Sequence, residues 1–373
     1  MSTKMSGISS SSVPPMSIAP MIQWTDRYWR YYFRLISRKT LLYTEMVMDN
    51  AIIYNSKNLD PFLGHNDVEH PLAIQLGGCN PTRLGEAAYL CETYSNFHEI
   101  NLNCGCPSNK AKKAGFGAEL MLDPELVRQI THEMKRRATS TDITVKCRLG
   151  VTGKDSFDDL VQFITSVKAT GITKIILHAR SCVLKGLSPA QNRSIPPLHP
   201  ELAHNIVKLF PDMQFVLNGG LKDFETCKKH LGWINQSPTD NSSEEENEFF
   251  PPVHGVMVGR EAYNNPFLFT TADSEFFNSP DQYFTRMEIL DKYLDFVEEA
   301  QDLHLYHSNT CNMMKPLHNI FHGCAANPIY KQKLDAMIVQ HSKKIDQGKT
   351  KFRDVVLDTI ADTIPKEFLH SYS

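Results

Sequence analysis

The fold is decided by residues 98–108, which read HEINLNCGCPS. His98–Asn103 is a short apolar run of the length expected for a buried strand, and it stops in a loop bounded by Gly105 and Pro107. Similar runs recur between helical stretches over the first 260 residues. We therefore expect eight strands, at Met16–Pro20, Leu41–Val47, Leu72–Gly77, His98–Asn103, Ile143–Leu149, Lys174–Ala179, Gln214–Asn218 and Gly255–Val258.

The alternation of these strands with helices predicts an α/β fold with parallel strands. Eight strands over roughly 250 residues are typical of a (β/α)₈ TIM barrel, whose chemistry lies at the C-terminal ends of the strands. A doubly wound open sheet would show the same alternation, so spacing alone leaves both architectures open.

Capping residues mark several of the connecting helices. Asn80 and Asp123 each precede a proline, which is typical of a helix start. The helix after Asp123 carries apolar residues at four-residue spacing, which predicts a buried stripe at Leu126, Ile130 and Met134. Ser156 with Asp159 resembles a capping box, and Gly171 is expected to end that helix.

The chain is expected to have three parts. Residues 1–15 are Ser-rich and predicted to be disordered, residues 16–280 form the barrel, and residues 281–373 form a small all-helical domain. An acidic, solvated insertion at 236–252 interrupts the barrel before its last strand. In the helical domain we expect an amphipathic helix through Tyr293, and further helical stretches around Leu317–Cys324, Ile329–Ser342 and Phe352–Ile364.

Composition limits the class of protein. With 41% hydrophobic and 22% charged residues, the chain is neither disordered nor fibrous, and no apolar run is long enough for a spanning helix. An odd count of nine cysteines without a secretory signal favours reduced thiols in the cytoplasm, with organellar targeting as a weaker alternative. The net charge of −3 does not indicate nucleic-acid binding, but five acids fall in the insertion, which permits a basic surface elsewhere.

Two predicted loops have the composition of a phosphate site. Asn218-Gly219-Gly220 follows the seventh strand and Gly259-Arg260 follows the eighth. In TIM barrels these loops commonly bind phosphate through backbone N–H groups, and the guanidinium of Arg260 suits an anion. The glycines could instead serve a tight turn, but finding both signals at both loops favours a phosphate.

Three polar side chains are predicted to lie at the same end of the barrel. Lys146 stands in an apolar strand, where it could be a Schiff-base nucleophile, a surface charge or a partner for an electron-rich ring. His178 alone would more often be structural. Together with Gln75 and the phosphate loops, these residues suit a planar phosphorylated cofactor such as FMN.

Cys106 is the strongest catalytic candidate. Most free cysteines are small buried hydrophobes, but a thiol in a Gly-Cys-Pro turn at the barrel mouth is well placed as a general acid. A free thiol of pKa about 8.5 holds its proton at neutral pH. The pair Cys104 and Cys106 could also suggest metal or redox chemistry, but without a second ligand pair we predict no metal site.

Taken together, these segments resemble the tRNA-dihydrouridine synthases, and specifically their A-type branch. The resemblance runs from about Ser17 to Phe267 and rests on many separated motifs in order. They are Ala19-Pro20-Met21, Trp24-Thr25-Asp26-Arg27, Leu42-Tyr43-Thr44-Glu45-Met46, Gln75-Leu76-Gly77-Gly78, Glu99-Ile100-Asn101-Leu102-Asn103, Gly105-Cys106-Pro107-Ser108, Lys146, His178-Ala179-Arg180, Gly186-Leu187-Ser188-Pro189, Asn192-Arg193, Pro196-Pro197-Leu198, Asn218-Gly219-Gly220 and Val258-Gly259-Arg260-Glu261-Ala262-Tyr263.

The resemblance implies an FMN enzyme that uses NADPH to reduce uridine to 5,6-dihydrouridine in the D-loop of tRNA, at positions 20 and 20a. Hydride would pass from reduced FMN to C6 and a proton from Cys106 to C5, on a base flipped out of its stack. The residues implied to hold FMN are Pro20, Met21, Gln75, Lys146, His178, Asn218, Gly219, Gly220, Gly259 and Arg260. Asn103 would contact the uracil, and Arg180, Lys185, Arg193 and Lys331 would contact the RNA.

Two features depart from the family pattern. Cys104 stands where relatives usually have Val, and Pro328 stands where an Arg is expected, with Lys331 keeping a positive charge one turn on.

Two other functions stay open. One is an FMN oxidoreductase acting on a free pyrimidine, as dihydroorotate dehydrogenases do, although a small substrate needs no helical appendage. The other is a non-catalytic tRNA-binding protein, which the intact Cys106, Lys146 and His178 disfavour. We expect neither membrane attachment nor an obligate protein partner.

Overall fold

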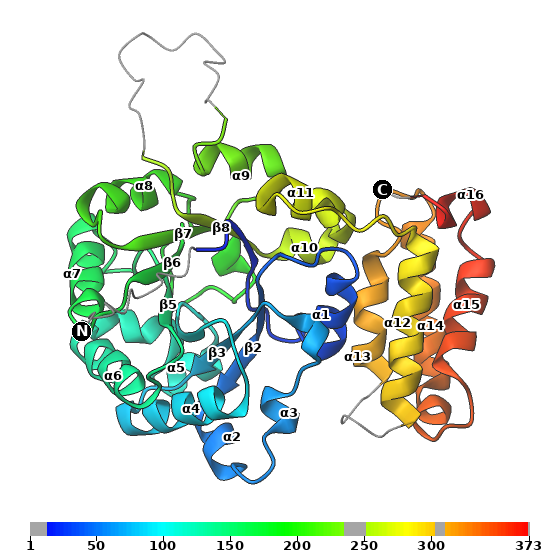
Figure 1. Cartoon of the computed structure of the whole chain (residues 1–373), viewed down its shortest axis with the longest axis horizontal. Coiled ribbons are helices and arrows are strands. Elements are labelled where there is room, and N and C mark those ends of the chain that lie inside the picture. Colours follow the sequence, from blue (N-terminus) through cyan, green and yellow to red (C-terminus); the bar gives the residue numbers. More distant parts are fainter. Residues whose placement is uncertain (1–12, 235–250, 303–309, 372–373) are drawn as a thin grey trace, which may run out of the picture.

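The central element is a barrel of eight parallel strands. The computed structural model describes residues 13–234, 251–302 and 310–371. The strands run in the order β1-β8-β7-β6-β5-β4-β3-β2. Backbone hydrogen bonds from Ile18 N to Leu41 O (2.9 Å) and from Leu41 N to Met16 O (3.2 Å) join the two ends of this order. The sheet therefore closes on itself, which excludes the open-sheet alternative (Figure 1).

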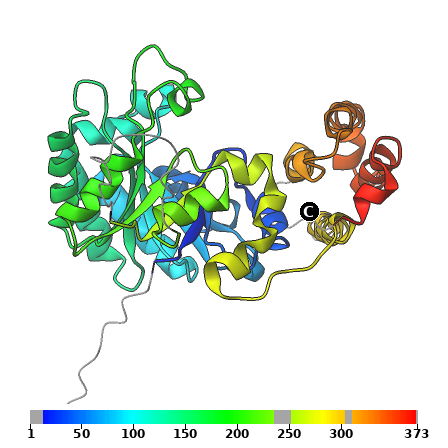
Figure 2. The same ribbon diagram turned by 90° about the horizontal axis from the view of Figure 1, so that it is seen from above.

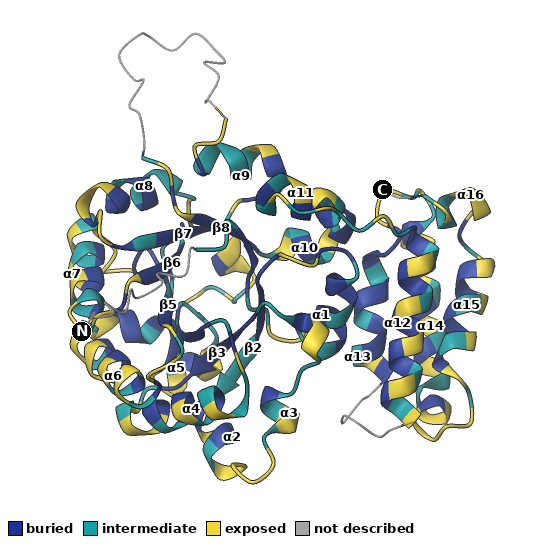
Figure 3. Cartoon of the chain, viewed as in Figure 1, coloured by how far each residue is buried: buried dark blue, intermediate teal, exposed yellow. Residues whose placement is uncertain are grey.

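All eight predicted strands are present. They are β1 Met16–Ile18, β2 Leu42–Met48, β3 Leu72–Gly77, β4 Ile100–Cys104, β5 Ile143–Arg148, β6 Lys174–His178, β7 Gln214–Asn218 and β8 Gly255–Val258. Their bounds lie within a few residues of the prediction, because strands covered on both faces read as nearly continuous apolar runs. Figure 3 shows the strands buried inside a shell of helices whose outer faces are exposed.

The helices around the barrel follow the strands in turn. They are α1 Arg27–Arg34, α2 Asp49–Tyr54, α3 Asp60–Leu63, η1 Asp67–Glu69, α4 Pro81–Tyr94, α5 Asn109–Lys113, η2 Gly117–Leu122, α6 Pro124–Arg137, α7 Phe157–Lys168, η3 Gln191–Arg193, α8 Pro200–Leu209, α9 Phe224–His230, α10 Arg260–Asn264, η4 Pro266–Thr271 and α11 Ala272–Phe277, where η marks a 3₁₀ helix.

The predicted caps form as expected, with one shift in a buried stripe. Asn80 and Asp123 cap α4 and α6, and the capping box of Ser156 and Asp159 starts α7. On α6 the stripe passes through Val127, while Leu126 is only partly buried. The 3.6-residue period lets either neighbour face the core, and packing against the barrel selects Val127.

A separate group of helices follows the barrel. It consists of α12 Arg286–Asp302, α13 Thr310–Met314, η5 Lys315–Asn319, α14 Asn327–Asp346, α15 Phe352–Ala361 and α16 Lys366–Leu369. Figure 2 shows these helices beside the barrel, on the side of α1 and α10. The stretch predicted to be helical around Leu317–Cys324 is instead a 3₁₀ turn followed by irregular turns, because Pro316 interrupts regular helix hydrogen bonding.

Aromatic side chains pack the helical group onto the barrel. Phe296 of α12 stacks on Tyr31 of α1 with ring centroids 3.8 Å apart. The guanidinium of Arg286 lies 3.8 Å from the ring centroid of Phe267. Such ring contacts add stability beyond the buried area, so α12 is held firmly against α1.

Parts of the predicted organisation lie outside the described residues, namely 1–12 of the N-terminal segment and 236–250 of the acidic insertion. Within the described part of the chain, no helix combines the length and the apolar character needed to cross a membrane.

Candidate active site

The loop after β4 holds Cys106 at the mouth of the barrel. The side-chain oxygen of Asn103 accepts hydrogen bonds from the backbone N–H groups of Gly105 (3.1 Å) and Cys106 (2.9 Å). The carbonyl of Cys106 accepts from the N–H of Ala118 at 3.0 Å. A Cβ on Gly117 would lie 2.6 Å from that carbonyl, so only glycine permits this approach. The backbone of Cys106 is thus fixed on both sides, while its side chain stays partly accessible.

The neighbouring thiol has a different environment. Cys104 is fully buried, and burial raises the pKa of its thiol well above the ordinary value. This thiol therefore keeps its proton at neutral pH. Among the described residues, no group of three His, Cys, Asp or Glu side chains is placed to hold a metal ion.

Gln75 and Asn103 are brought together across two adjacent strands. The amide nitrogen of Asn103 donates to the side-chain oxygen of Gln75 at 2.7 Å. The amide nitrogen of Gln75 in turn donates to Asn101 at 2.8 Å. The sequence prediction assigned Gln75 to the cofactor and Asn103 to the substrate, and the structure adds that the two side chains orient each other.

Lys146 lies on the neighbouring strand β5, in register with Asn103 of β4. Its ammonium group donates to the side-chain oxygen of Asn218 at 2.9 Å, and the amide of Asn218 donates to Met257 O at 2.7 Å. Burial, together with the charge of Arg148, lowers the pKa of Lys146 to about 8. Lys146 therefore has one neutral hydrogen-bond partner and a strong electrostatic preference for an anionic or electron-rich group.

His178 and the glycines after β7 form a close-packed turn. Gly219 and Gly220 have φ values of +107° and +76°, which glycine adopts most easily. A Cβ on Gly219 would lie 2.7 Å from Cδ2 of His178. Burial, followed by the charges of Arg148 and Lys146, holds the pKa of His178 well below its ordinary value, so its imidazole is neutral.

Three arginines complete the set of cations around this opening. Arg180 donates to Pro196 O, and Arg260 donates to Arg193 O at 3.1 Å. Burial, followed by the charge of Arg260, lowers the pKa of Arg180 and of Arg193. In the described part of the chain, none of these arginines, nor Lys146 or Arg148, forms a salt bridge with a carboxylate. The mouth therefore has a surplus of donors and positive charge, which fits a ligand that carries phosphate.

Arg148 is a site residue that sequence reasoning passed over. Its guanidinium donates to the carbonyls of Gly105 (3.0 Å), Ser181 (3.2 Å) and Asn192 (2.9 Å). It thereby ties the Cys106 loop to the segment after β6. Its position two residues after Lys146 was visible in the sequence, but its carbonyl partners depend on tertiary structure.

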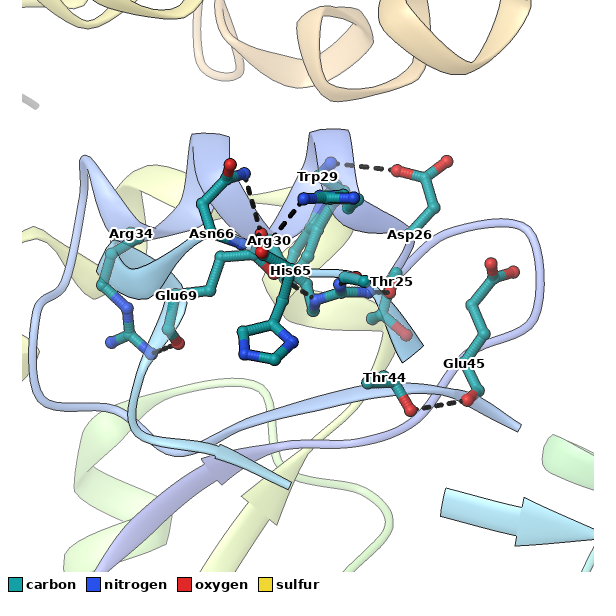
Figure 4. A network of polar contacts seen from close by, with 12 residues as sticks. Thr25, Asp26, Trp29, Arg30, Arg34, Thr44, Glu45, His65, Asn66 and Glu69 are labelled. Atoms are coloured by element: carbon teal, nitrogen blue, oxygen red, sulfur yellow. Dashed lines mark hydrogen bonds and ion pairs between the residues drawn. The ribbon is translucent and has the colours of Figure 1, made fainter. Parts of the chain in front are cut away.

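The loop after β1 is held by a second polar network. The guanidinium of Arg30 pairs with Glu69 at 2.7 Å and donates to Thr25 O at 2.9 Å, as Figure 4 shows. Thr25 Oγ1 accepts from Met21 N at 3.0 Å. Pro20 and Met21 consequently lie at a fixed rim of the barrel mouth.

The same network includes an acidic group of unusual pKa. Asp26 caps α1 by accepting from Trp29 N at 3.0 Å. Burial, together with the nearby carboxylate of Glu45, raises the pKa of Asp26 to about 6. Its second oxygen, Oδ2, is buried and has no hydrogen-bond partner.

Three predicted residues remain, and of these Lys331 lies apart from this cluster. Lys185 is exposed in the segment between β6 and η3, and Gly259 precedes α10. Lys331 lies on α14 in the helical group, one turn from Asp335, and is not part of the barrel mouth. Contacts connect the barrel to the helical group: Trp24 stacks on Tyr263, and the hydroxyl of Tyr263 lies 3.3 Å from Nδ1 of His318.

The sequence of this chain is similar to those of a known protein family. The family model described as dihydrouridine synthase (Dus) matches residues 17–237 and 244–356. A tRNA-dihydrouridine(20/20a) synthase of Pseudomonas putida is 42% identical over 274 residues, covering 74% of this chain and 75% of the relative. One of Shewanella oneidensis is 35% identical over 346 residues, covering 92% and 95%.

Among solved structures, an old yellow enzyme homologue from Zymomonas mobilis has a TM-score of 0.45 at 13% identity, covering 72% of this chain and 89% of that one. The match to the family model spans both the barrel and most of the helical group. The chain belongs to the dihydrouridine synthase family.

Proposed function

We propose that this chain is a flavin-dependent tRNA-dihydrouridine synthase, which reduces uridine to 5,6-dihydrouridine in the D-loop of tRNA. The observation that carries the proposal is the placement of Cys106: a partly accessible thiol on a braced loop, at a barrel mouth rich in donors and cations. Relatives named tRNA-dihydrouridine(20/20a) synthase support positions 20 and 20a as the target.

The residues at the mouth fit FMN. Lys146 and the neutral His178 would face an electron-rich ring, with Gln75 at its edge. Gly219, Gly220, Gly259 and Arg260 would hold the phosphate, since their backbone N–H groups and guanidinium lack a carboxylate partner among the described residues. Pro20 and Met21 would border the bound FMN at the rim of the barrel mouth. Bound FMN would supply the hydride that C6 of uracil needs.

The chain's own part is to hold the base and deliver a proton. Hydride addition at C6 places negative charge on C5 and O4, so an acid must stand over C5. Sγ of Cys106 carries that proton, and Asn103 fixes the loop from which it is delivered. Because a uridine in tRNA must leave its stack to reach a barrel mouth, the surrounding Arg180, Lys185 and Arg193 would contact its backbone.

We further propose that NADPH is the reductant, that Lys331 contacts tRNA from the helical group, and that the enzyme works in the cytoplasm. The free state of all nine cysteines agrees with a reducing compartment. Reduction rates with NADPH and with NADH, measured on the same preparation, test the reductant.

The test of function uses purified protein and tRNA transcribed in vitro. Wild-type protein should show flavin absorbance and should convert uridine to dihydrouridine, located by nuclease digestion and mass spectrometry. Cys106→Ser should abolish conversion, whereas Cys311→Ser, which changes an exposed thiol in the helical group, should not. Free uracil and orotate serve as alternative substrates. A colourless protein, or turnover of free pyrimidine but not of tRNA, contradicts the proposal.

A further inference from the structure

A chain of hydrogen bonds crosses the inside of the barrel and ends at the Cys106 loop. It starts at Glu99, just before β4, and passes through side chains of three strands. The successive bonds are Thr144 Oγ1 to Glu99 Oε1 (2.8 Å), Asn101 Nδ2 to Thr144 Oγ1 (2.8 Å), Gln75 Nε2 to Asn101 Oδ1 (2.8 Å) and Asn103 Nδ2 to Gln75 Oε1 (2.7 Å).

Glu99 is a buried carboxylate that can only accept hydrogen bonds. It is 1% exposed, and it receives hydrogen bonds from Tyr43 and Thr144 together with an ion pair from Lys174. Burial alone would raise the pKa of Glu99, but the charge of Lys174 and these hydrogen bonds outweigh it and hold the pKa below the ordinary value. Glu99 is therefore ionised.

An ionised carboxylate at one end determines the direction of every bond in the chain. The hydroxyl of Thr144 must give its single proton to Glu99, so its oxygen is left to accept from Asn101. Asn101 then presents its oxygen to Gln75, and Gln75 presents its oxygen to Asn103. Each amide has its nitrogen directed toward Glu99, and no member can reverse without leaving two donors or two acceptors opposed.

The far end of the chain has the complementary polarity. The oxygen of Asn103 is turned toward the backbone N–H groups of Gly105 and Cys106, which can only donate. One N–H bond of the Asn103 amide remains after the bond to Gln75. That hydrogen is left for a carbonyl oxygen in the substrate.

We propose that Glu99 is a positioning residue, which sets the direction of this chain and so holds Asn103 with its oxygen toward the Cys106 loop and one N–H toward the uracil. The proposal rests on the proposed function, in which Cys106 delivers the proton. It assigns to Glu99, Asn101 and Thr144 a role in the reaction although none of them reaches the mouth.

The consequence for specificity is that Asn103 recognises an acceptor. Uracil offers carbonyl oxygens at C2 and C4, and Asn103 can donate to one of them. If the chain lost its direction, Asn103 could turn its NH₂ group toward Gly105 and Cys106, where it would face other donors. The Cys106 loop would then lose two hydrogen bonds and the thiol would become mobile.

The test compares two substitutions at Thr144 in the flavin-loaded enzyme, one that keeps the shape of the side chain and one that keeps its hydroxyl. Thr144→Val removes the hydroxyl that joins Glu99 to Asn101, whereas Thr144→Ser keeps it. We expect Thr144→Val to lower kcat for tRNA reduction about tenfold, the effect of one net hydrogen bond, with KM for tRNA unchanged. Thr144→Ser should recover most of the loss. Thr131→Val removes an equally buried hydroxyl on α6 and controls for general destabilisation.

A second readout is independent of turnover. Alkylation of Cys106 by iodoacetamide, followed peptide by peptide without tRNA, should be several-fold faster in Thr144→Val than in wild type, Thr144→Ser or Thr131→Val. Glu99→Gln gives position 99 an amide that can donate a hydrogen bond, so it should also raise the alkylation rate of Cys106. This variant replaces Thr144→Val in the test if Thr144→Val does not fold.

The outcomes separate this inference from the proposed function. Equal alkylation rates in Thr144→Val and Thr144→Ser, or equal losses of kcat in these two variants and Thr131→Val, overturn the positioning role. A wild-type enzyme that reduces no uridine overturns the proposed function, yet the alkylation rates would still decide whether Glu99 orients the loop.

Discussion

Substitution of Arg148 is the most specific way to perturb the Cys106 loop. Its guanidinium satisfies the carbonyls of Gly105, Ser181 and Asn192 at 2.9–3.2 Å, and its side chain is buried. Arg148→Lys keeps the charge, but one ammonium group cannot reach three carbonyls that the planar guanidinium spans. At least one buried carbonyl then lacks a donor, at a cost of about 1–3 kcal/mol per carbonyl.

The expected result is a loss of about 3 kcal/mol of stability and a slower chemical step. Thermal unfolding followed by calorimetry should show Tm lowered by roughly 5–10 °C. Because the Cys106 loop loses its link to Ser181 and Asn192, kcat should fall more than KM for tRNA rises. Arg136→Lys, on an exposed face of α6, is the matched control and should change neither. An Arg148→Lys enzyme with wild-type Tm and kcat would refute the bracing role of the guanidinium.

Three other changes test separate parts of the account. Gly219→Ala should lower the amount of flavin retained on gel filtration at least tenfold, because the new Cβ would lie 2.7 Å from His178 and φ of residue 219 is +107°. The control is Gly348→Ala, in a turn with open space around it, which should keep flavin bound. Asp26→Asn should raise the free energy of unfolding, measured with urea, by up to about 2 kcal/mol at pH 7.5 and by nothing below pH 4. The reason is that the pKa of Asp26 in the folded protein, about 6, lies above the ordinary 3.8, so wild-type stability falls as pH rises through that window. A difference between variant and wild type that stays constant across pH would contradict this. Lys331→Ala should weaken tRNA binding and reduce the slope of log K against log salt by about one contact, and an unchanged slope would remove Lys331 from the interface.

Sequence reasoning located the strands well. Buried parallel strands are apolar on both faces, so the sequence shows where they lie as short apolar runs. Polar residues at the ends of these runs are easily recognised as site candidates. Cys106, Lys146 and His178 were found in this way, and the structure brings them to one end of the barrel. The assignment of individual residues to cofactor or RNA stays a prediction.

The connections between these residues could not be read from the chain. Asn101 and Asn103 lie on one face of β4 and Glu99 just before it, at the same two-residue spacing, but Gln75 and Thr144 come from neighbouring strands whose register the sequence does not specify. Likewise, nothing in the sequence says that Arg148 turns toward three carbonyls. The stretch around Leu317–Cys324 was mistaken for a helix because its apolar spacing is helical, while Pro316 and the packing against Tyr263 favour turns.

The most direct measurement of the central claim is a single turnover. Enzyme whose flavin has been reduced in advance is mixed without oxygen with unmodified tRNA, and flavin reoxidation is followed by absorbance. If Sγ of Cys106 delivers the proton to C5, Cys106→Ala should slow reoxidation by about a hundredfold or more, with tRNA affinity unchanged. A Cys106→Ala enzyme that reoxidises at the wild-type rate and still forms dihydrouridine would contradict the account.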